Sequence, residues 1–335
     1  MARMRALVEH TDGLQVSSLG EAGALPLVVT PPRRAPLDAW LSQLSGLVAD
    51  ALPEVGGVLF RGFDVPGVAA FQRFVWSFGS PLLSYEFGST PRTDLGEGVY
   101  TSTEYPAHQA IPLHSEQSYT LEWPMRIWFH CVQPSEQGGE TPIADCREIY
   151  RRIDDEVCRR FTQLGLMYVR NYGNGLDLPW QRAFNTEDRA IVEAFCRTHR
   201  IQFEWKSDGE LRTRQICQAV ARHPASGEWV WFNQAHLFHV SNLAPAIADA
   251  LLGAVDEADL PRNVYYGDGS PIEPEVLEHV RGVLDACAVK FPWQQGDILM
   301  LDNMLAAHGR CPFSGPRQVV VAMAQSYSIK ASLMQ

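Results

Sequence analysis

The sequence predicts a mainly β protein with additional α-helices, built on a double-stranded β-helix (jelly-roll) core of two stacked antiparallel sheets. Strand-like runs gather in the first part of the chain and again near its C-terminal end, and helical stretches lie between them. A parallel βαβ sheet would alternate strands and helices to the end, which this chain does not do. No linker is recognisable, so we expect a single domain over residues 1–335, with a helical or irregular insert at about 165–290.

The N-terminal part alternates strands and helices. Residues 1–35 read as two short strands around turns, and residues 37–51 carry apolar side chains at helical spacing up to Pro53. Residues 56–63 follow as a buried strand, and residues 67–79 as a second helix. This region therefore supplies helices that flank the core.

The central strands and the insert follow in order. MRIWFHCVQP (125–134) is aromatic and β-branched, which favours a buried strand, and a helix is expected from about Cys146 to Leu164. In and just before the insert we expect a strand at 164–173, a loop and helix at 178–199, strands and hairpins at 201–233 with SDGE and ASGE as turns, and helices within 241–285. The C-terminal part then reads as a buried strand within 293–303, a loop at 308–316 and a last strand at 317–328.

Composition narrows the classes of function. A net charge of −11 argues against a nucleic-acid partner, which requires concentrated Lys and Arg. No run approaches the ~18 apolar residues of a membrane span, and the N-terminus lacks the apolar region of a signal peptide. Seven scattered cysteines without a CxxC motif indicate reduced thiols. We therefore expect a cytoplasmic protein with no membrane or nucleic-acid partner.

The segment IPLHSEQS (111–118) carries the strongest chemical signal. His114 and Glu116 are two residues apart, so on a β-strand both side chains leave the same face. An imidazole and a carboxylate supply two of the three ligands of a 2-His-1-carboxylate iron site, which keeps open positions for chemistry. His308, in a C-terminal run that a barrel would bring close, is the candidate third ligand. The alternative is an incidental polar pair on a surface strand.

Two further features accompany this pattern. GGETP (138–142) offers a tight turn followed by the hydroxyl of Thr141, and its alternative is a plain hairpin turn. Arg317 begins the last strand, on the same face as Val319 and Val321. A buried guanidinium needs an anion, and a carboxylate matches its planar fork. The alternative for Arg317 is a structural salt bridge.

The order of these motifs resembles the taurine dioxygenase and clavaminate synthase superfamily of Fe(II)/2-oxoglutarate-dependent oxygenases. It resembles in particular the syringomycin-type amino acid hydroxylases of nonribosomal peptide biosynthesis. The resemblance extends from about residue 55 to 330 and is carried by YTSTEYP (100–106), IPLHSEQSY (111–119), GGETPIADCR (138–147), WFNQAHLFHVS (231–241) and the elements LDNMLAAHGR and GPR within 301–317.

The resemblance implies a role for each matching residue. His114, Glu116 and His308 would bind Fe(II) as the catalytic centre, and Thr141 and Arg317 would hold the distal carboxylate of 2-oxoglutarate. The cosubstrate would be decarboxylated to succinate and CO2 while O2 oxidises a C–H bond. Taurine dioxygenase has a second arginine four residues after the cosubstrate arginine, and Val321 stands there in this chain. A sulfonate substrate is therefore not expected.

Candidate substrate contacts come from two segments. Ser102, Glu104 and Tyr105 lie on the strand-like segment before His114 and would line the pocket. Asn233 and His236, with His239 three residues further on, are candidates for contact with the substrate or support of the metal ligands.

Several functions remain open at this stage. The first is hydroxylation of an amino acid, free or attached to a peptidyl carrier protein, in secondary metabolism. Desaturation, epoxidation or cyclisation would use the same cofactors and leave no separate motif. Halogenation is disfavoured because Glu116 fills the site that a chloride would need. A barrel that has lost catalysis and serves as a binding protein would contain no iron and release no succinate.

Overall fold

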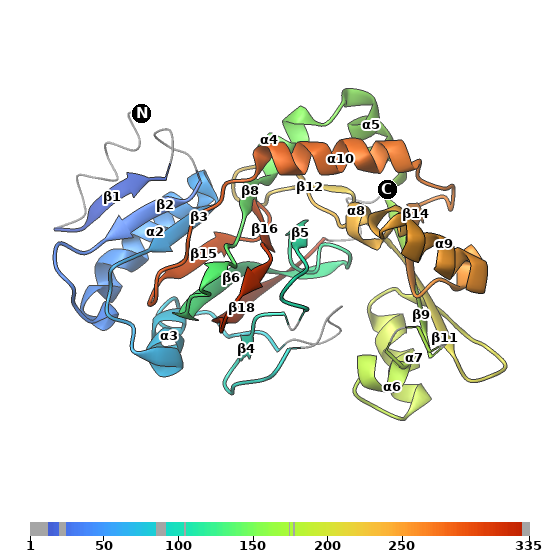
Figure 1. The fold of residues 1–335 in the computed structure, drawn as a ribbon, viewed down its shortest axis with the longest axis horizontal. Coiled ribbons are helices and arrows are strands. Elements are labelled where there is room, and N and C mark those ends of the chain that lie inside the picture. Colours follow the sequence, from blue (N-terminus) through green and yellow to red (C-terminus); the bar gives the residue numbers. More distant parts are fainter. Residues whose placement is uncertain are drawn as a thin grey trace.

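The structure is a computed structural model that describes residues 13–19, 25–84, 92–103, 105–173, 175–176 and 178–329. Of the described strands, seven form one sheet in the order β1, β2, β3, β15, β6, β18, β4 (Figure 1). Their bounds are β1 (Gln15–Ser18), β2 (Leu27–Thr30), β3 (Gly57–Phe60), β15 (Ile298–Asp302), β6 (Glu122–Gln133), β18 (Gln318–Ser328) and β4 (Val99–Thr101). Neighbours are antiparallel except β2 and β3. The strands near the two chain ends therefore pair with one another, as the sequence predicts.

A second, three-stranded sheet of described strands lies against the large one. It contains β5 (Ile111–His114), β16 (Ala306–Arg310) and β8 (Ile143–Asp145), in that order. Ile143 and Ala306 from this sheet share a buried apolar cluster with Phe129, Leu299 and Val319 from the large one. The two sheets therefore enclose a common core. Short strand pairs extend them, β7 (Gln137–Gly138) with β17 (Phe313–Ser314) and β12 (Val220–Arg222) with β13 (Trp229–Trp231).

Two N-terminal helices cover the other face of the large sheet. They are α2 (Leu41–Val55), which continues from the 3-10 helix η1 (Leu37–Trp40), and α3 (Gly67–Trp76). Leu44 and Phe74 belong to the apolar cluster that packs on Phe60 and Val320. The expected end at Pro53 is wrong, because α2 continues through it to Gly56. Proline removes one N–H bond near the end of the helix, and the left-handed Gly56 then stops it.

The insert is not helical or irregular throughout, because it contains an antiparallel sheet of four described strands. Its order is β10 (Gln202–Trp205), β11 (Leu211–Cys217), β9 (Leu166–Tyr172) and β14 (Arg262–Tyr266). The strands and turns expected before residue 233 are present, but β14 interrupts the expected helical region. Its RNVYY sequence is favourable for a strand between Pro261 and Gly267. The helices α6 (Trp180–Ala183) and α7 (Arg189–Thr198) flank this sheet.

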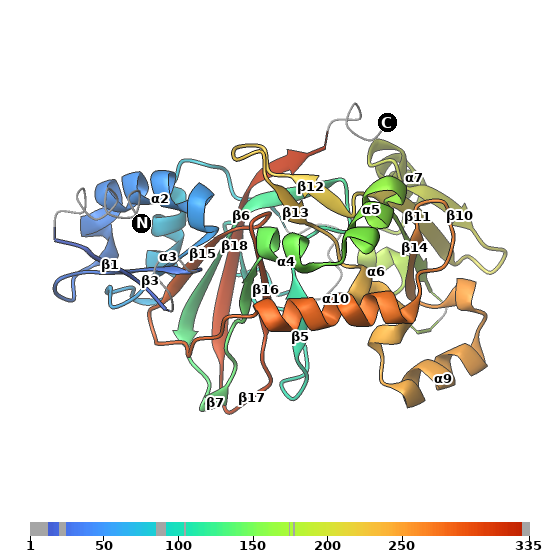
Figure 2. The same cartoon turned by 90° about the horizontal axis from the view of Figure 1, so that it is seen from above.

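The remaining helices lie between β8 and β9, between β13 and β14, and between β14 and β15, and Figure 2 shows α10 running from the insert toward β16. Their bounds are α4 (Cys146–Arg152), α5 (Asp155–Leu164), α8 (Ala235–Phe238), η2 (Val240–Asn242), α9 (Pro245–Ala254), η3 (Glu257–Asp259) and α10 (Pro274–Cys287). The single helix expected from Cys146 to Leu164 is two helices. Ile153 and Asp154 adopt extended backbone angles, and this breaks the helix.

All seven cysteines are free thiols. Among the described helices, each is too short or too polar to cross a lipid bilayer. Cytoplasmic location itself stays a prediction.

Acid should destabilise the protein through His130. Burial lowers the pKa of His130 to about 4, whereas an unfolded histidine titrates near 6.5. Between these values the unfolded chain binds a proton that the native chain does not, so the free energy of unfolding falls as pH falls, by up to about 1.4 kcal/mol per pH unit. Replacing His130 with Phe, which preserves its stacking on Phe71, should make urea-unfolding free energies less steep between pH 6 and 5. An unchanged slope would contradict the assignment.

Candidate active site

Three metal-ligating side chains meet where the two small-sheet strands β5 and β16 pair. His114 on β5 lies directly opposite His308 on β16, and their ring centroids are 4.6 Å apart. Glu116 joins them, so that one ligand atom from each of the three residues lies within 4.8 Å of the others. Among the described residues this is the one such cluster of three His, Cys, Asp or Glu side chains. The structure thus brings together the triad expected from the sequence.

The local geometry differs from the expected strand. β5 ends at His114, and Glu116 lies in a turn, so the two-residue spacing does not place both side chains on one strand face. Gln117 has a φ of 55°, a left-handed conformation that turns the chain away from β16. Conversely, His308 lies within strand β16, although 308–316 reads as a loop. The pairing with β5 and β8 stabilises this strand despite Gly309 and Pro312.

Both histidines are in the state that binds a metal. The Nδ1–H of His114 donates to the Pro112 carbonyl at 2.9 Å, which leaves the Nε2 lone pair available. Burial lowers the pKa of His114, although Glu116 opposes this shift. Burial and the charges of His114 and Arg92 hold the pKa of His308 well below its usual value. The imidazoles are therefore neutral at neutral pH, as metal ligands must be.

The candidate carboxylate ligand, Glu116, has a cationic neighbour that no pattern in the sequence predicts. The Nη2 group of Arg92 donates to Glu116 Oε2 at 2.6 Å, and the two side chains are only 4% and 6% exposed. A buried carboxylate with an arginine on one oxygen keeps the other oxygen for a metal. His308 adds a buried Nδ1 that has no hydrogen-bond partner among the described residues. Two neutral imidazoles and one such carboxylate fit an iron(II) ion.

A narrow pocket beside the two histidines is strongly cationic. Arg92, Arg310 and Arg317 line it, together with Ser102 and Thr141, and among the described lining residues none carries a carboxylate. Arg92 is already paired with Glu116, but the guanidinium groups of Arg310 and Arg317 have no carboxylate partner among the described lining residues, and this favours an anionic occupant. Ser102, a predicted substrate contact, thus lines this cationic pocket.

The two residues expected to bind a carboxylate are held in place by backbone and indole groups. Arg317 directly precedes β18, and its Nε donates to the Gly139 carbonyl at 3.1 Å. Burial and the nearby Arg310 lower the pKa of Arg317 to about 10, so it stays protonated at neutral pH. The indole Nε1 of Trp293 donates to Thr141 Oγ1 at 3.1 Å, which leaves the Thr141 hydroxyl proton free to be donated.

Gly139 in the GGETP turn is required by this arrangement. Its φ is +74°, and a Cβ there would lie 2.4 Å from Ser135 Oγ and 3.0 Å from Arg317 Nε. The motif is therefore more than a hairpin turn, because it lets the arginine approach the backbone.

A second cavity, of about 150 Å³, adjoins the cationic pocket and shares His114 and Arg92 with it. His114 and Glu116 line it together with Tyr105, Arg262 and Phe238. Arg310 donates to the carbonyls of Tyr105, Pro106 and Gln109 at 2.7–2.9 Å, which holds the loop carrying Tyr105 at the cavity. Glu104, also expected here, lies outside the described residues.

Two expected substrate contacts lie elsewhere. Neither Asn233 nor His236 lines the small cavity or the cationic pocket. Asn233 is buried, donates to the Ala219 carbonyl and accepts from the Ala235 N–H. His236 is also buried, and its Nε2 donates to the Leu113 carbonyl at 2.8 Å. Their neighbour Gln234, for which the sequence predicts no role, does line the small cavity.

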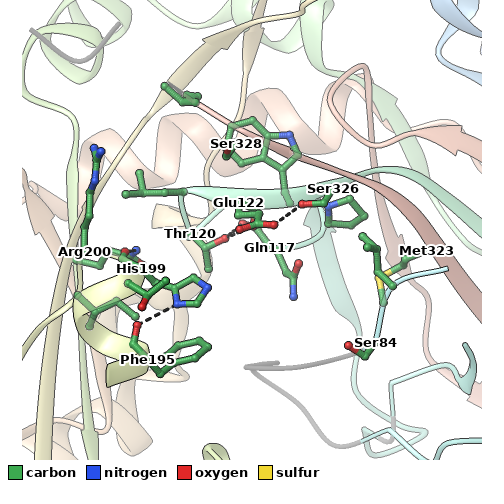
Figure 3. Close-up of a pocket in the computed structure, with 18 residues that line it drawn as sticks. Ser84, Gln117, Thr120, Glu122, Phe195, His199, Arg200, Met323, Ser326 and Ser328 are labelled. Atoms are coloured by element: carbon green, nitrogen blue, oxygen red, sulfur yellow. Dashed lines mark hydrogen bonds between the residues drawn. The ribbon is translucent and has the colours of Figure 1, made fainter. Parts of the chain in front are cut away.

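A larger cavity, of about 400 Å³, is lined by none of the three clustered residues, and Figure 3 shows the side chains that form its wall. Gln117 lines it, but the preceding Glu116 does not. His199, whose Nδ1 donates to the Phe195 carbonyl, and Glu122, which accepts from Ser326, are other parts of its wall. None of the three clustered metal-ligating side chains lines this cavity, whereas they do line the two smaller spaces, so the candidate active site lies at the smaller spaces.

The sequence matches a known family over most of its length. The model of the family described as "Taurine catabolism dioxygenase TauD, TfdA family" matches residues 23–323. The dapdiamide synthesis protein DdaC of Enterobacter agglomerans is 42% identical over 297 residues, 89% of this chain and 90% of DdaC. A clavaminate synthase-like protein of Arabidopsis thaliana is 31% identical over 323 residues, 90% of this chain and 94% of that protein.

Solved structures share the fold. The PvcB protein of Pseudomonas aeruginosa superposes with a TM-score of 0.53 at 17% identity, over 93% of this chain and 91% of PvcB. A second PvcB structure, with a TM-score of 0.51, is described as an Fe, alpha-ketoglutarate dependent oxygenase from an isonitrile synthetic pathway. The family model and the two sequence relatives show more than a shared fold, because they match the amino-acid sequence itself over most of the chain. The chain belongs to the TauD/TfdA family and is an iron(II)- and 2-oxoglutarate-dependent dioxygenase.

Proposed function

We propose that this dioxygenase hydroxylates an unactivated C–H bond of an amino acid, free or attached to a peptidyl carrier protein, in secondary metabolism. His114, Glu116 and His308 are the proposed iron ligands. The observation that carries the proposal is the position of this triad between two spaces, one strongly cationic and one of amino-acid size. The relatives named for dapdiamide synthesis and an isonitrile pathway support a role in secondary metabolism.

The cationic pocket is the proposed site of 2-oxoglutarate. Arg317 and the Thr141 hydroxyl, which Trp293 orients, bind its distal carboxylate. When bound, iron and 2-oxoglutarate react with O2 to give succinate and CO2, and the second oxygen atom is transferred to the substrate. The protein surrounds this chemistry with Phe129, Ile111 and Val319, which restrict water.

The small cavity is the proposed substrate site. Its volume of about 150 Å³ accommodates a group of amino-acid size. Arg262 supplies a cation that suits the carboxylate of a free amino acid, while Leu237 and Phe238 supply apolar surface for the substrate's side chain. Tyr105 and Gln234 add polar groups that can orient it. Desaturation, epoxidation or cyclisation of an amino acid-derived substrate is the alternative, because these reactions use the same groups.

We also propose a more specific architecture for the fold. We interpret the two facing sheets as the double-stranded β-helix expected from the sequence, with residues 1–335 as a single domain. The shared core of Ile143, Ala306 and Leu299 supports this interpretation.

Product analysis tests the proposed reaction. The enzyme is incubated with Fe(II), 2-oxoglutarate and free or carrier-bound amino acids under ¹⁸O2, and mass spectrometry follows succinate and substrate. We expect one substrate to gain a single ¹⁸O atom with each succinate released, and no halogenated product in high chloride, because Glu116 provides the third protein ligand. Loss of two hydrogens without oxygen would favour desaturation. A halogenated product would contradict the role of Glu116.

A further inference from the structure

The segment that carries His114 and Glu116 loses its strand partner just where the ligands lie. β5 pairs with β16 at Ile111 and His114, and the pairing stops there. On either side of His114, side chains from distant segments bind the backbone instead. His236 Nε2 donates to the Leu113 carbonyl at 2.8 Å, and Gln234 Nε2 donates to the Ser115 carbonyl at 2.8 Å.

Asn303 makes the most extensive of these contacts, and it makes them to the metal ligand itself. Its Oδ1 accepts from the Glu116 N–H at 2.7 Å, and its Nδ2 donates to the Glu116 carbonyl at 2.9 Å. The second proton of Nδ2 is donated to the Pro124 carbonyl at 2.9 Å. Asn303 is fully buried, so these bonds have no competition from water. One amide thus satisfies both backbone groups of Glu116, as a neighbouring strand would.

Asn303 also connects Glu116 to the other half of the metal site. It lies in the turn between β15 and β16, and β16 carries His308. This turn is itself fixed: the Asn303 N–H donates to the Met125 carbonyl, and the Asp302 carboxylate accepts from the N–H groups of Met304 and Leu305. Because the turn that leads into β16 and His308 also holds the backbone of Glu116, the separation of these two residues is set before a metal binds.

We propose that Asn303 is a positioning residue for the iron site, which fixes the Glu116 carboxylate relative to His308. The inference rests on the proposed metal ligands. A ligand whose backbone is held needs no ordering when the metal binds, and groups that support metal ligands typically contribute 10–100-fold to metal affinity. Removing Asn303 should therefore weaken metal binding by about that factor, while the ligands themselves remain.

The chain offers a closely matched control in Asn171 of β9. Asn171 is equally buried, and its Nδ2 donates to two backbone carbonyls, those of Ala258 and Leu260, at 2.9 and 2.7 Å. Its Oδ1 accepts one bond, from Arg212 Nε at 2.8 Å. Replacing Asn171 with alanine therefore removes two donated hydrogen bonds and one accepted hydrogen bond, the same numbers as in Asn303→Ala, and none of them involves a proposed metal ligand.

The experiment measures the dissociation constant of Mn(II), by electron paramagnetic resonance of the free ion, for metal-free wild type, Asn303→Ala, Asn171→Ala and Glu116→Ala. Metal-free urea unfolding reports stability in parallel. We expect Asn303→Ala to bind Mn(II) about 10–100-fold more weakly, and Asn171→Ala to bind like wild type even if both lose stability. Should either alanine variant fail to fold, Asn303→Ser and Asn171→Ser give the same comparison, because a serine hydroxyl is too short to span both backbone groups.

The outcomes separate this inference from the metal site on which it rests. If wild type binds no Mn(II), or Glu116→Ala binds it unchanged, the proposed metal ligands are wrong. If those two behave as expected but Asn303→Ala retains wild-type affinity, only the role of Asn303 is overturned. Equal weakening in Asn171→Ala would also overturn it, because the effect would then follow from general destabilisation.

Discussion

Replacing His114 with alanine should abolish iron retention and succinate formation together. Two remaining ligands, Glu116 and His308, leave the ion with too few protein bonds to compete with water and buffer, and without iron 2-oxoglutarate is not decarboxylated. Iron is measured per chain after gel filtration, and succinate by mass spectrometry. The effect should be close to complete, because the triad is the one such cluster among the described residues.

His199→Ala is the matched control. The Nδ1 of His199 donates to a backbone carbonyl at 2.9 Å, as the Nδ1 of His114 does, but His199 lies in the larger cavity. The control should therefore retain iron and turnover. Full activity in His114→Ala, or an equal loss in His199→Ala, would mean that the metal lies elsewhere.

The second large effect concerns Arg317. Truncating it to alanine leaves the distal carboxylate of 2-oxoglutarate without its charged partner in a pocket that excludes water. Removal of one member of a buried, hydrogen-bonded charge pair typically costs about 2–5 kcal/mol. At 1.4 kcal/mol per decade, the apparent 2-oxoglutarate constant should rise about 30-fold or more. Initial succinate rates over a range of 2-oxoglutarate concentrations measure it.

Two comparisons sharpen this test. Arg317→Lys keeps the positive charge but loses the planar fork, so its constant should lie between those of wild type and Arg317→Ala. Iron retention should be unchanged in both variants, because Arg317 is not a ligand. An unchanged 2-oxoglutarate constant in Arg317→Ala would leave the residue with a structural role only, through its bond to the Gly139 carbonyl.

The ligand residues were predictable from the sequence because their chemistry is local. The pair His114 and Glu116 alone could be incidental, and it is the order of this pair, the GGETP motif, His308 and Arg317, with the resemblance that this order carries, that predicts a metal site. The backbone itself was predicted less well. His114 and Glu116 were expected on one strand, whereas the left-handed Gln117 and the Asn303 amide hold Glu116 in a turn.

The supporting residues could not be predicted, because their roles depend on contacts between distant segments. In the sequence, Asn303 reads as the last residue of a buried strand, and Trp293 as part of the turn before that strand. Neither has a spacing relative to its partner, Glu116 or Thr141, that periodicity could detect. Strand β16 was missed for a related reason. Its glycine and the following proline predict a loop, and only pairing with β5 and β8 makes it a strand.

The most direct test of the proposed active site is a crystal structure with Mn(II) and N-oxalylglycine, which stand in for Fe(II) and 2-oxoglutarate. We predict one metal ion bound by His114, Glu116 and His308 at about 2.0–2.2 Å, with the distal carboxylate of N-oxalylglycine on Arg317 and Thr141. A metal ion bound by other residues, or an N-oxalylglycine carboxylate away from Arg317, would contradict this account.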